Sequence, residues 1–167
     1  MTFPFHLEAL RDGHGRDVFS SGDEALDRYL KTQVTQDIRR RVANCFVAVE
    51  ATLGSLAGYY TLAASSIPLP DLPPDIAKRL PRYPAIPAVR IGRLAVDQRY
   101  QGRGLGEALL IDALRRTIDA PIAAFAIVVD AKHDKATAFY RRYGFISFAG
   151  QPRTLFLPIA TAAKLLL

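Results

Sequence analysis

A strand–loop–helix unit in the middle of the chain constrains the fold most. An extended apolar run over residues 91–96 leads into Gln101-Gly102-Arg103-Gly104-Leu105-Gly106, and an amphipathic helix is expected from near Gly104 to about Thr117. Glycine lets the backbone come close to a ligand and adopt dihedrals closed to other residues. The first turn of a helix also leaves N–H groups that point at a bound anion. The unit therefore predicts a site for a phosphate or pyrophosphate.

Two common phosphate-binding patterns do not fit this unit. The dinucleotide fingerprint G-x-G-x-x-G opens a repeating parallel unit, whereas the spacing here is G-x-G-x-G in the second half of the chain. The nucleoside-triphosphate loop needs Gly-Lys-Ser/Thr, and Gly106-Glu107 does not supply it. The phosphorylated ligand is thus expected to be of another kind.

The length of 167 residues predicts one domain over residues 1–167. We expect no membrane span, because no run of about 18 uncharged apolar residues occurs. The first six residues lack the basic start and apolar stretch of a secretory signal. Cys45, the single cysteine, lies in an apolar run, so its side chain is expected to be buried. A chain with one cysteine is expected in a reducing compartment, which favours the cytoplasm.

The charge is strongly basic, with a formal net charge of +6 and 17 arginines among 22 basic residues. The planar guanidinium suits phosphate better than the lysine ammonium. A polyanionic partner such as nucleic acid explains this composition, and so does the arginine preference of a GC-rich genome.

In the first half, Ser21 and Glu24 form a capping box that predicts a helix over residues 22–40. Residues 43–51 and 56–67 are expected to form two strands joined by a turn. Seven of the 11 prolines lie within residues 68–87, which predicts an irregular segment with one short helix after Pro74.

In the second half, a strand near residues 89–96 precedes the glycine loop and its helix. A buried strand over 122–130, a helix over 135–143 ended by Gly144, and short strands over 145–148 and 154–157 follow. The apolar tail over 159–167 is expected to form either an interface or a packed helix. The fold class is α/β (α+β), a mixed central sheet with helices on both faces.

Two separated motifs resemble the GNAT superfamily of acetyl-CoA-dependent N-acetyltransferases. The loop 101–106 matches its Q/R-x-x-G-x-G/A motif, and residues 136–145 (ATAFYRRYGF) resemble its A-x-x-F-Y-x-x-x-G-F element. The resemblance covers the chain from about Val42 onward and implies acetyl-CoA as the cofactor.

The resemblance implies a role for each part of the site. Backbone N–H groups of residues 102–106 would hold the coenzyme A pyrophosphate, with Arg103 adding a phosphate contact. Gln101, His133 and Tyr140 are also expected to bind the cofactor. The backbone of the preceding strand, at Leu94, Ala95 and Val96, would bind the pantetheine arm and stabilise the carbonyl oxygen.

Tyr140 is the expected proton donor to the departing thiolate, with simple packing as the alternative role. His133 stands where the family often has asparagine against the cofactor, and a solvated helix cap is the alternative for it. The histidines have no metal-ligand spacing, so no metal site is expected.

Within this family, the first hundred residues resemble the acetyltransferase toxins of bacterial toxin–antitoxin systems. Residues 19–30 (FSSGDEALDRYL) are similar to that group's F-x-C-G-x-x-x-L-D-x-Y-L opening, with Ser21 in place of cysteine. The resemblance implies acetylation of the α-amino group of the amino acid on charged tRNA, which blocks translation. It also implies a homodimer and a ribbon-helix-helix antitoxin.

The acceptor cleft is expected to bind RNA phosphates through arginines. The candidates are Arg39, Arg40, Arg79, Arg82, Arg90, Arg93, Arg141 and Arg142, and Arg41 continues the run that ends the first long helix. An N-acetyltransferase for a small-molecule or protein amine is the alternative function, and a non-catalytic module that binds acyl-CoA or nucleic acid is the third.

Overall fold

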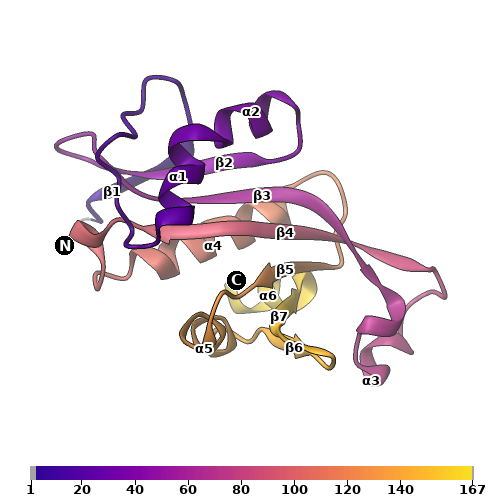
Figure 1. Ribbon diagram of the computed structural model, residues 1–167. Helices are drawn as coiled ribbons and strands as arrows, with labels where there is room; N and C mark the ends of the chain where they lie inside the picture. The colour runs from indigo at the N-terminus through magenta and orange to yellow at the C-terminus, as the bar shows by residue number, and fades with distance from the viewer. Residues whose placement is uncertain (1–2, 167) are drawn as a thin grey trace. The chain divides into compact units, whose positions relative to one another are not determined.

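The computed structural model describes residues 3–166, which form a mixed sheet with helices (Figure 1). The strands are β1 (Phe5–Ala9), β2 (Asn44–Glu50), β3 (Leu56–Pro68), β4 (Ala85–Val96), β5 (Ala126–Asp130), β6 (Ile146–Phe148) and β7 (Gln151–Pro158). The helices are α1 (Glu24–Thr32), α2 (Val34–Arg39), α3 (Pro74–Ala77), α4 (Leu105–Asp119), α5 (Asp134–Arg142) and α6 (Ile159–Leu166), with 3-10 turns η1 (Leu69–Asp71) and η2 (Gln98–Tyr100). No helix within residues 3–166 has the length and apolar character to cross a bilayer.

Contacts divide the chain into two compact units. Unit 1 comprises the described residues up to 63 together with 92–113, and unit 2 comprises 64–91 together with the described residues from 114 onward. The strand order is β1-β2-β3-β4-β5-β7-β6, and β3 and β4 each run from one unit into the other. The mixed sheet with helices agrees with the predicted fold class.

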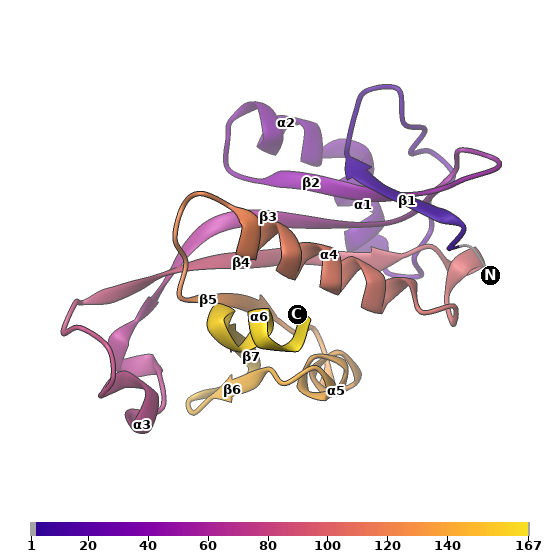
Figure 2. The same ribbon diagram turned by 180° about the vertical axis from the view of Figure 1, so that it is seen from behind.

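In unit 1, β3 is buried on both faces because α1 and α4 cover opposite sides of it (Figures 1 and 2). Side chains alternate along a strand, so successive tyrosines meet different helices. The Tyr59 hydroxyl donates to the Leu26 carbonyl at 2.6 Å, and the Tyr60 hydroxyl donates to an Asp112 carboxylate oxygen at 2.6 Å. The two bonds fix both helices against the same strand.

In unit 2, residues Ala88–Ile91 of β4 pair in parallel with Ala126–Val129 of β5, and β7 pairs antiparallel with both β5 and β6. The proline-rich segment carries η1 and α3, and the helix after Pro74 confirms the prediction. Leu72 in this segment is buried with Phe148 and Phe156, so its core contacts hold the segment.

The prediction of one helix over residues 22–40 capped by Ser21 is wrong in two details. Asp23 is the N-cap of α1, because its carboxylate accepts the N–H groups of Ala25 and Leu26. The helix also breaks at Gln33, which separates α1 from α2. The Thr32 hydroxyl donates to the Arg28 carbonyl at 2.7 Å, a bond of the kind that bends helices.

Two strands also differ from expectation. β1 was not predicted, because only Phe5 of its five residues is buried and the strand depends on β2 for its pairing. β5 begins at Ala126 rather than at residue 122, and Ile122 is 81% exposed. The burial of Cys45 is confirmed, and burial raises the pKa of its thiol to about 12.

Candidate functional site

The last residues of β4 extend beyond its ladder with β5. The parallel pairs end at Ile91↔Val129, whereas β4 continues to Val96. Leu94, Ala95 and Val96 therefore lie on the stretch after the ladder. Ala95 is buried in the core of unit 1 beneath α1, which anchors this stretch from one side.

The glycine loop that follows has the backbone conformation that the sequence required of it. Gly102 and Gly104 have φ values of +80° and +79°, where L side chains are disfavoured. A Cβ on either residue would meet nothing within 4 Å, so backbone conformation rather than crowding demands glycine. Both glycines are exposed, whereas Leu105 is buried and anchors the start of α4.

The start of α4 presents main-chain donors at this loop. The first bond of the helix runs from the Ala108 N–H to the Gly104 carbonyl at 3.1 Å, so the N–H groups of residues 105–107 precede the helical ladder. These donors, together with the positive end of the helix, suit an anion. The loop and first turn, including half-buried Gly106, therefore fit a pyrophosphate-bearing ligand.

Arg103 adds positive charge to the exposed loop. Its guanidinium carbon lies 5.6 Å from the centroid of the Tyr100 ring, and that of Arg99 lies 5.2 Å from the same centroid. The ring holds both cations by its π-face. Arg103 is thus placed to contact a phosphate at the loop.

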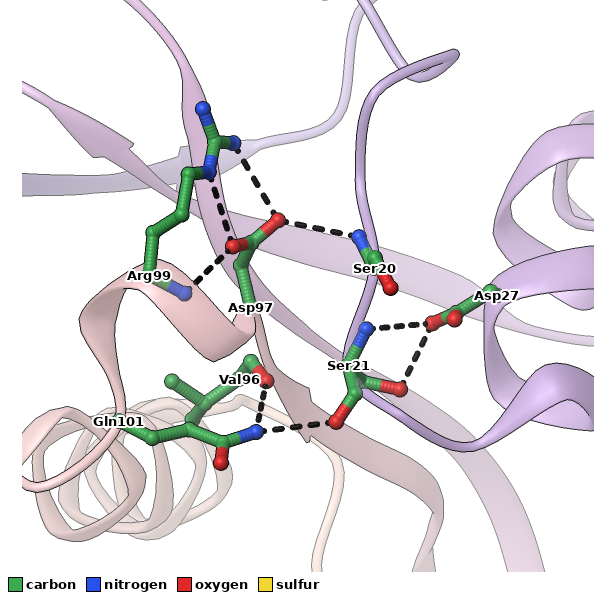
Figure 3. A network of polar contacts seen from close by, with 7 residues as sticks. All are labelled: Ser20, Ser21, Asp27, Val96, Asp97, Arg99 and Gln101. Carbon is green, nitrogen blue, oxygen red and sulfur yellow. Dashed lines mark hydrogen bonds and ion pairs between the residues drawn. The ribbon is translucent and has the colours of Figure 1, made fainter.

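A buried carboxylate ties the end of β4 to the segment before α1 (Figure 3). Asp97 is 1% exposed and accepts hydrogen bonds from the Ser20 N–H, at 3.0 Å, and from the Arg99 N–H and guanidinium. Burial acts to raise the pKa of Asp97, but the bonds from Arg99 and Ser20 outweigh it and hold the pKa below its usual range. The carboxylate stays charged and fixes the turn into the loop.

The Gln101 side chain is exposed, but its amide is hydrogen-bonded to the protein backbone. Its amide nitrogen donates to the Ser21 carbonyl and to the Val96 carbonyl, each at 2.9 Å (Figure 3). The side chain of Gln101 therefore bridges two backbone segments at the loop entrance.

In unit 2, His133 is the N-cap of α5. Its Nδ1 accepts the Ala136 N–H at 3.1 Å, and the ring is exposed at the surface. This bond confirms the helix-cap role that the sequence left as an alternative. Gly144, with φ +93°, ends the helix as predicted.

Tyr140 lies on the buried face of α5. The residue is 8% exposed, and its ring packs edge-on against Phe139, at 5.1 Å between ring centroids, and tilted against Phe145 at 5.3 Å. Burial raises the pKa of the Tyr140 hydroxyl well above its usual value. The hydroxyl stays protonated at neutral pH, which is the state that a proton donor requires.

Three of the predicted RNA-contacting arginines lie in unit 1. Arg39 and Arg40 are exposed at the end of α2. Arg93 is half-buried, with its guanidinium carbon 3.5 Å from the centroid of the Tyr29 ring. The Tyr29 hydroxyl donates to Asp37 at 2.7 Å, so ring and carboxylate together fix the position of Arg93.

The other five lie in unit 2, on different segments and with different partners. Arg90 is ion-paired with Asp130, and Arg141 donates to the Ser147 hydroxyl at 2.8 Å. Arg142 lies 5.7 Å from the centroid of the Tyr143 ring. Arg79 and Arg82 are exposed in the proline-rich segment.

The sequence analysis assigned no role to three residues that organise unit 1, namely Tyr29, Asp37 and Asp97. The role of Asp97 could have been predicted, since burying an acidic residue directly after a buried strand costs free energy unless its carboxylate accepts hydrogen bonds. The roles of Tyr29 and Asp37 could not have been predicted, because their partner Arg93 lies more than 50 residues away in the chain.

Known proteins match this chain in sequence along most of its length. The acetyltransferase (GNAT) domain family matches residues 76–154. The tRNA-acetylating toxin of Mycobacterium tuberculosis is 37% identical over 150 residues, which are 89% of this chain and 88% of that protein. The probable toxin TacT of Sinorhizobium fredii is 30% identical over 162 residues, covering 92% and 90% of the two chains.

Solved structures match equally well. A tyrosine-to-phenylalanine mutant of KacT superposes with a TM-score of 0.91 at 30% identity, over 98% of this chain and 99% of that one. AtaT complexed with acetyl-methionyl-tRNAfMet superposes with a TM-score of 0.89 at 30% identity, over 98% of this chain and 99% of that one. A mutant AtaT toxin bound to the C-terminus of the antitoxin AtaR and acetyl-CoA gives 0.82 at 28% identity, with coverage of 98% and 99%. The chain therefore belongs to the GNAT acetyltransferases and, within them, to the family of the tRNA-acetylating toxins.

Proposed function

We propose that this protein is a toxin that transfers the acetyl group of acetyl-CoA to the α-amino group of the amino acid on charged tRNA and so blocks translation. The observation that supports acetyl-CoA as the acetyl donor is the exposed loop with positive φ at Gly102 and Gly104, which leads directly into α4. The similarity to AtaT, whose complex holds acetyl-methionyl-tRNAfMet, supports charged tRNA as the acceptor.

On the donor side, the backbone does most of the binding. Acetyl-CoA supplies a thioester whose carbonyl carbon the amine attacks, with release of the coenzyme A thiol. The N–H groups of residues 102–106 hold the pyrophosphate, and Arg103 adds a contact to phosphate. The main-chain groups of Leu94, Ala95 and Val96 bind the pantetheine arm and stabilise the charge that develops on the carbonyl oxygen.

Tyr140 acts as the proton donor of this reaction. Its Oη carries a proton at neutral pH and would donate it to the sulfur as the carbon–sulfur bond breaks, and the proton that the attacking amine loses would restore the hydroxyl. The attacking α-amine has an ordinary pKa of about 7.7–8.0, so it is partly neutral without a dedicated base. His133 supports the reaction by capping the helix that carries Tyr140.

The acceptor tRNA is held by phosphate contacts from arginines. Exposed Arg39 and Arg40, Arg93 on its tyrosine support, and the arginines of unit 2 at 79, 82, 90, 141 and 142 are the proposed contacts. The net charge of +6 favours such a polyanionic substrate.

The partners follow from the family. We expect a homodimer in the cytoplasm, where charged tRNA is found, and neutralisation by an antitoxin of the ribbon-helix-helix class. The structure of AtaT with the C-terminus of AtaR supports an antitoxin partner. Sedimentation of the purified protein, alone and with the product of an adjacent reading frame, tests both expectations.

The decisive experiment identifies the acetyl acceptor. The protein is incubated with radiolabelled acetyl-CoA and total aminoacylated tRNA, the RNA is digested, and labelled fragments are identified. We expect the label on an aminoacyl-adenosine fragment. Label on proteins or free amines alone would contradict the toxin function and indicate an ordinary amine acetyltransferase.

A further inference from the structure

The side-chain amide of Gln101 has no donor left for a ligand. A glutamine amide nitrogen carries two hydrogens, and the Gln101 nitrogen lies 2.9 Å from the Ser21 carbonyl oxygen and 2.9 Å from the Val96 carbonyl oxygen. Both neighbours are acceptors only, so the nitrogen, rather than the amide oxygen, must face them. The two hydrogens are therefore committed to the backbone of the protein.

The segment that Gln101 holds is itself fixed from both sides (Figure 3). Ser20 donates its N–H to Asp97 at 3.0 Å, and its carbonyl accepts the Gln98 N–H at 2.8 Å. Ser21 donates both its N–H, at 2.9 Å, and its hydroxyl, at 2.7 Å, to one carboxylate oxygen of Asp27 on α1. The start of the first helix is thus tied to the turn between β4 and α4.

We propose that Gln101 is a positioning residue, whose bridge between Ser21 and Val96 sets the glycine loop in its ligand-ready conformation before the ligand arrives. The inference rests on the proposed function, since it assigns the bridge to coenzyme A binding. A loop with two glycines at positive φ loses much conformational freedom on binding, and a bridge that orders its first residue lowers that cost.

The bridge also links two motifs that lie far apart in this sequence. The opening motif at residues 19–30 supplies the Ser21 carbonyl and its Asp27 support, and the loop motif supplies Gln101. Serine at position 21 suits this role, because its hydroxyl bonds Asp27 more strongly than a thiol would. The α1 segment therefore acts on the donor loop through backbone contacts.

The test combines hydrogen exchange of the ligand-free protein with calorimetry of coenzyme A binding. Gln101→Met removes both donors at similar size, and Gln101→Glu keeps the shape but offers only acceptors to the two carbonyls. Gln36→Met, on an exposed face of α2 in the same unit, is the matched control. The amides of Ser20, Ser21 and Gln98 report on the bridge, and that of Leu10, bonded to the Cys45 carbonyl at 3.0 Å, reports on unit 1 at a distance from it.

In both Gln101 variants we expect the rate of amide hydrogen exchange at Ser20, Ser21 and Gln98 to rise about fivefold, while the rate at Leu10 stays unchanged. Coenzyme A affinity should fall about fivefold, while turnover at saturating acetyl-CoA stays within about twofold. Weaker binding with unchanged exchange would mean that Gln101 contacts the ligand, and faster exchange with unchanged binding would mean that the bridge serves stability alone. Either result overturns the proposal. A wild-type protein that fails to bind coenzyme A would instead refute the proposed function, and the exchange data would still decide whether the bridge exists.

Discussion

The glycine loop and helix α5 serve the proposed reaction in opposite ways. In the proposed function the loop binds the cofactor through its backbone, and the side chains of Asp97 and Gln101 hydrogen-bond that backbone. On α5 the proposed chemistry depends on a single side chain, that of Tyr140, which its aromatic neighbours bury. Substitutions at the loop should therefore change coenzyme A affinity and protein stability, whereas substitutions on α5 should change the turnover rate.

The largest effect is expected on α5. Tyr140→Phe removes the proposed proton donor while keeping the ring and its packing, so turnover should fall about 100-fold or more. Acetyl-CoA affinity, measured by calorimetry, should stay within about twofold. Tyr83→Phe, at a 61% exposed tyrosine of the same unit, is the control and should retain full turnover. Equal turnover of Tyr140→Phe and wild type would remove Tyr140 from the mechanism.

At the loop, Asp97→Asn should cost about 2–3 kcal/mol in the free energy of unfolding at neutral pH. The substitution replaces a buried, charged acceptor of several hydrogen bonds by a group that points a donor at other donors. Urea denaturation measures the loss, with Asp12→Asn in an exposed loop as the control.

The pH dependence of this difference has a defined sign. The folded pKa of Asp97 lies below its unfolded value of about 3.9. Its contribution to stability is therefore complete above about pH 4 and is lost as the pH falls through the folded pKa. The stability gap between wild type and Asp97→Asn should narrow on acidification. A gap that widens below pH 4 would contradict the assignment.

Gly104→Ala tests whether the loop binds through its backbone conformation. Alanine at φ +79° costs about 1–2 kcal/mol, although space for its Cβ is open. If the loop relaxes to avoid this strain, coenzyme A affinity should fall about tenfold by calorimetry, with little change in turnover at saturation. Gly13→Ala, which also has open space but no positive φ, should bind as wild type does.

The smallest effect concerns Arg41, a non-glycine residue with φ +60° between α2 and β2. Arg41→Gly should raise the free energy of unfolding by about 1 kcal/mol, since it relieves the left-handed conformation. If Arg41 contacts tRNA phosphate beside the proposed contacts Arg39 and Arg40, the variant should also weaken tRNA binding and lower the salt slope of that binding by about one. Arg41→Gln separates the two effects: tRNA affinity should fall to the same extent while stability stays unchanged. Unaltered tRNA affinity in both variants would exclude Arg41 from the interface.

Local patterns predicted the elements whose signals lie within a few residues. The strand before the loop, the helix after it, the cap at His133 and the end of α5 at Gly144 all follow from short-range chemistry. β1 was not predicted from the sequence, because an edge strand with one buried residue shows little alternation of buried and exposed positions. Ser21 and Asp23 are both good helix caps, and Asp23 takes that role while Ser21 bonds Asp27.

The sequence by itself determined the fold class and the glycine loop, because glycine spacing and amphipathic periods are properties of neighbouring residues. Its two motifs indicated the family by their resemblance to those of known acetyltransferases. Only the tertiary structure decided what Gln101, Asp97 and Tyr29 do. Gln101 meets a carbonyl 80 residues earlier in the chain, and Asp97 meets a backbone N–H 77 residues earlier. Such contacts arise when β4 packs beside the segment before α1, and no local pattern encodes which donor will meet which acceptor there.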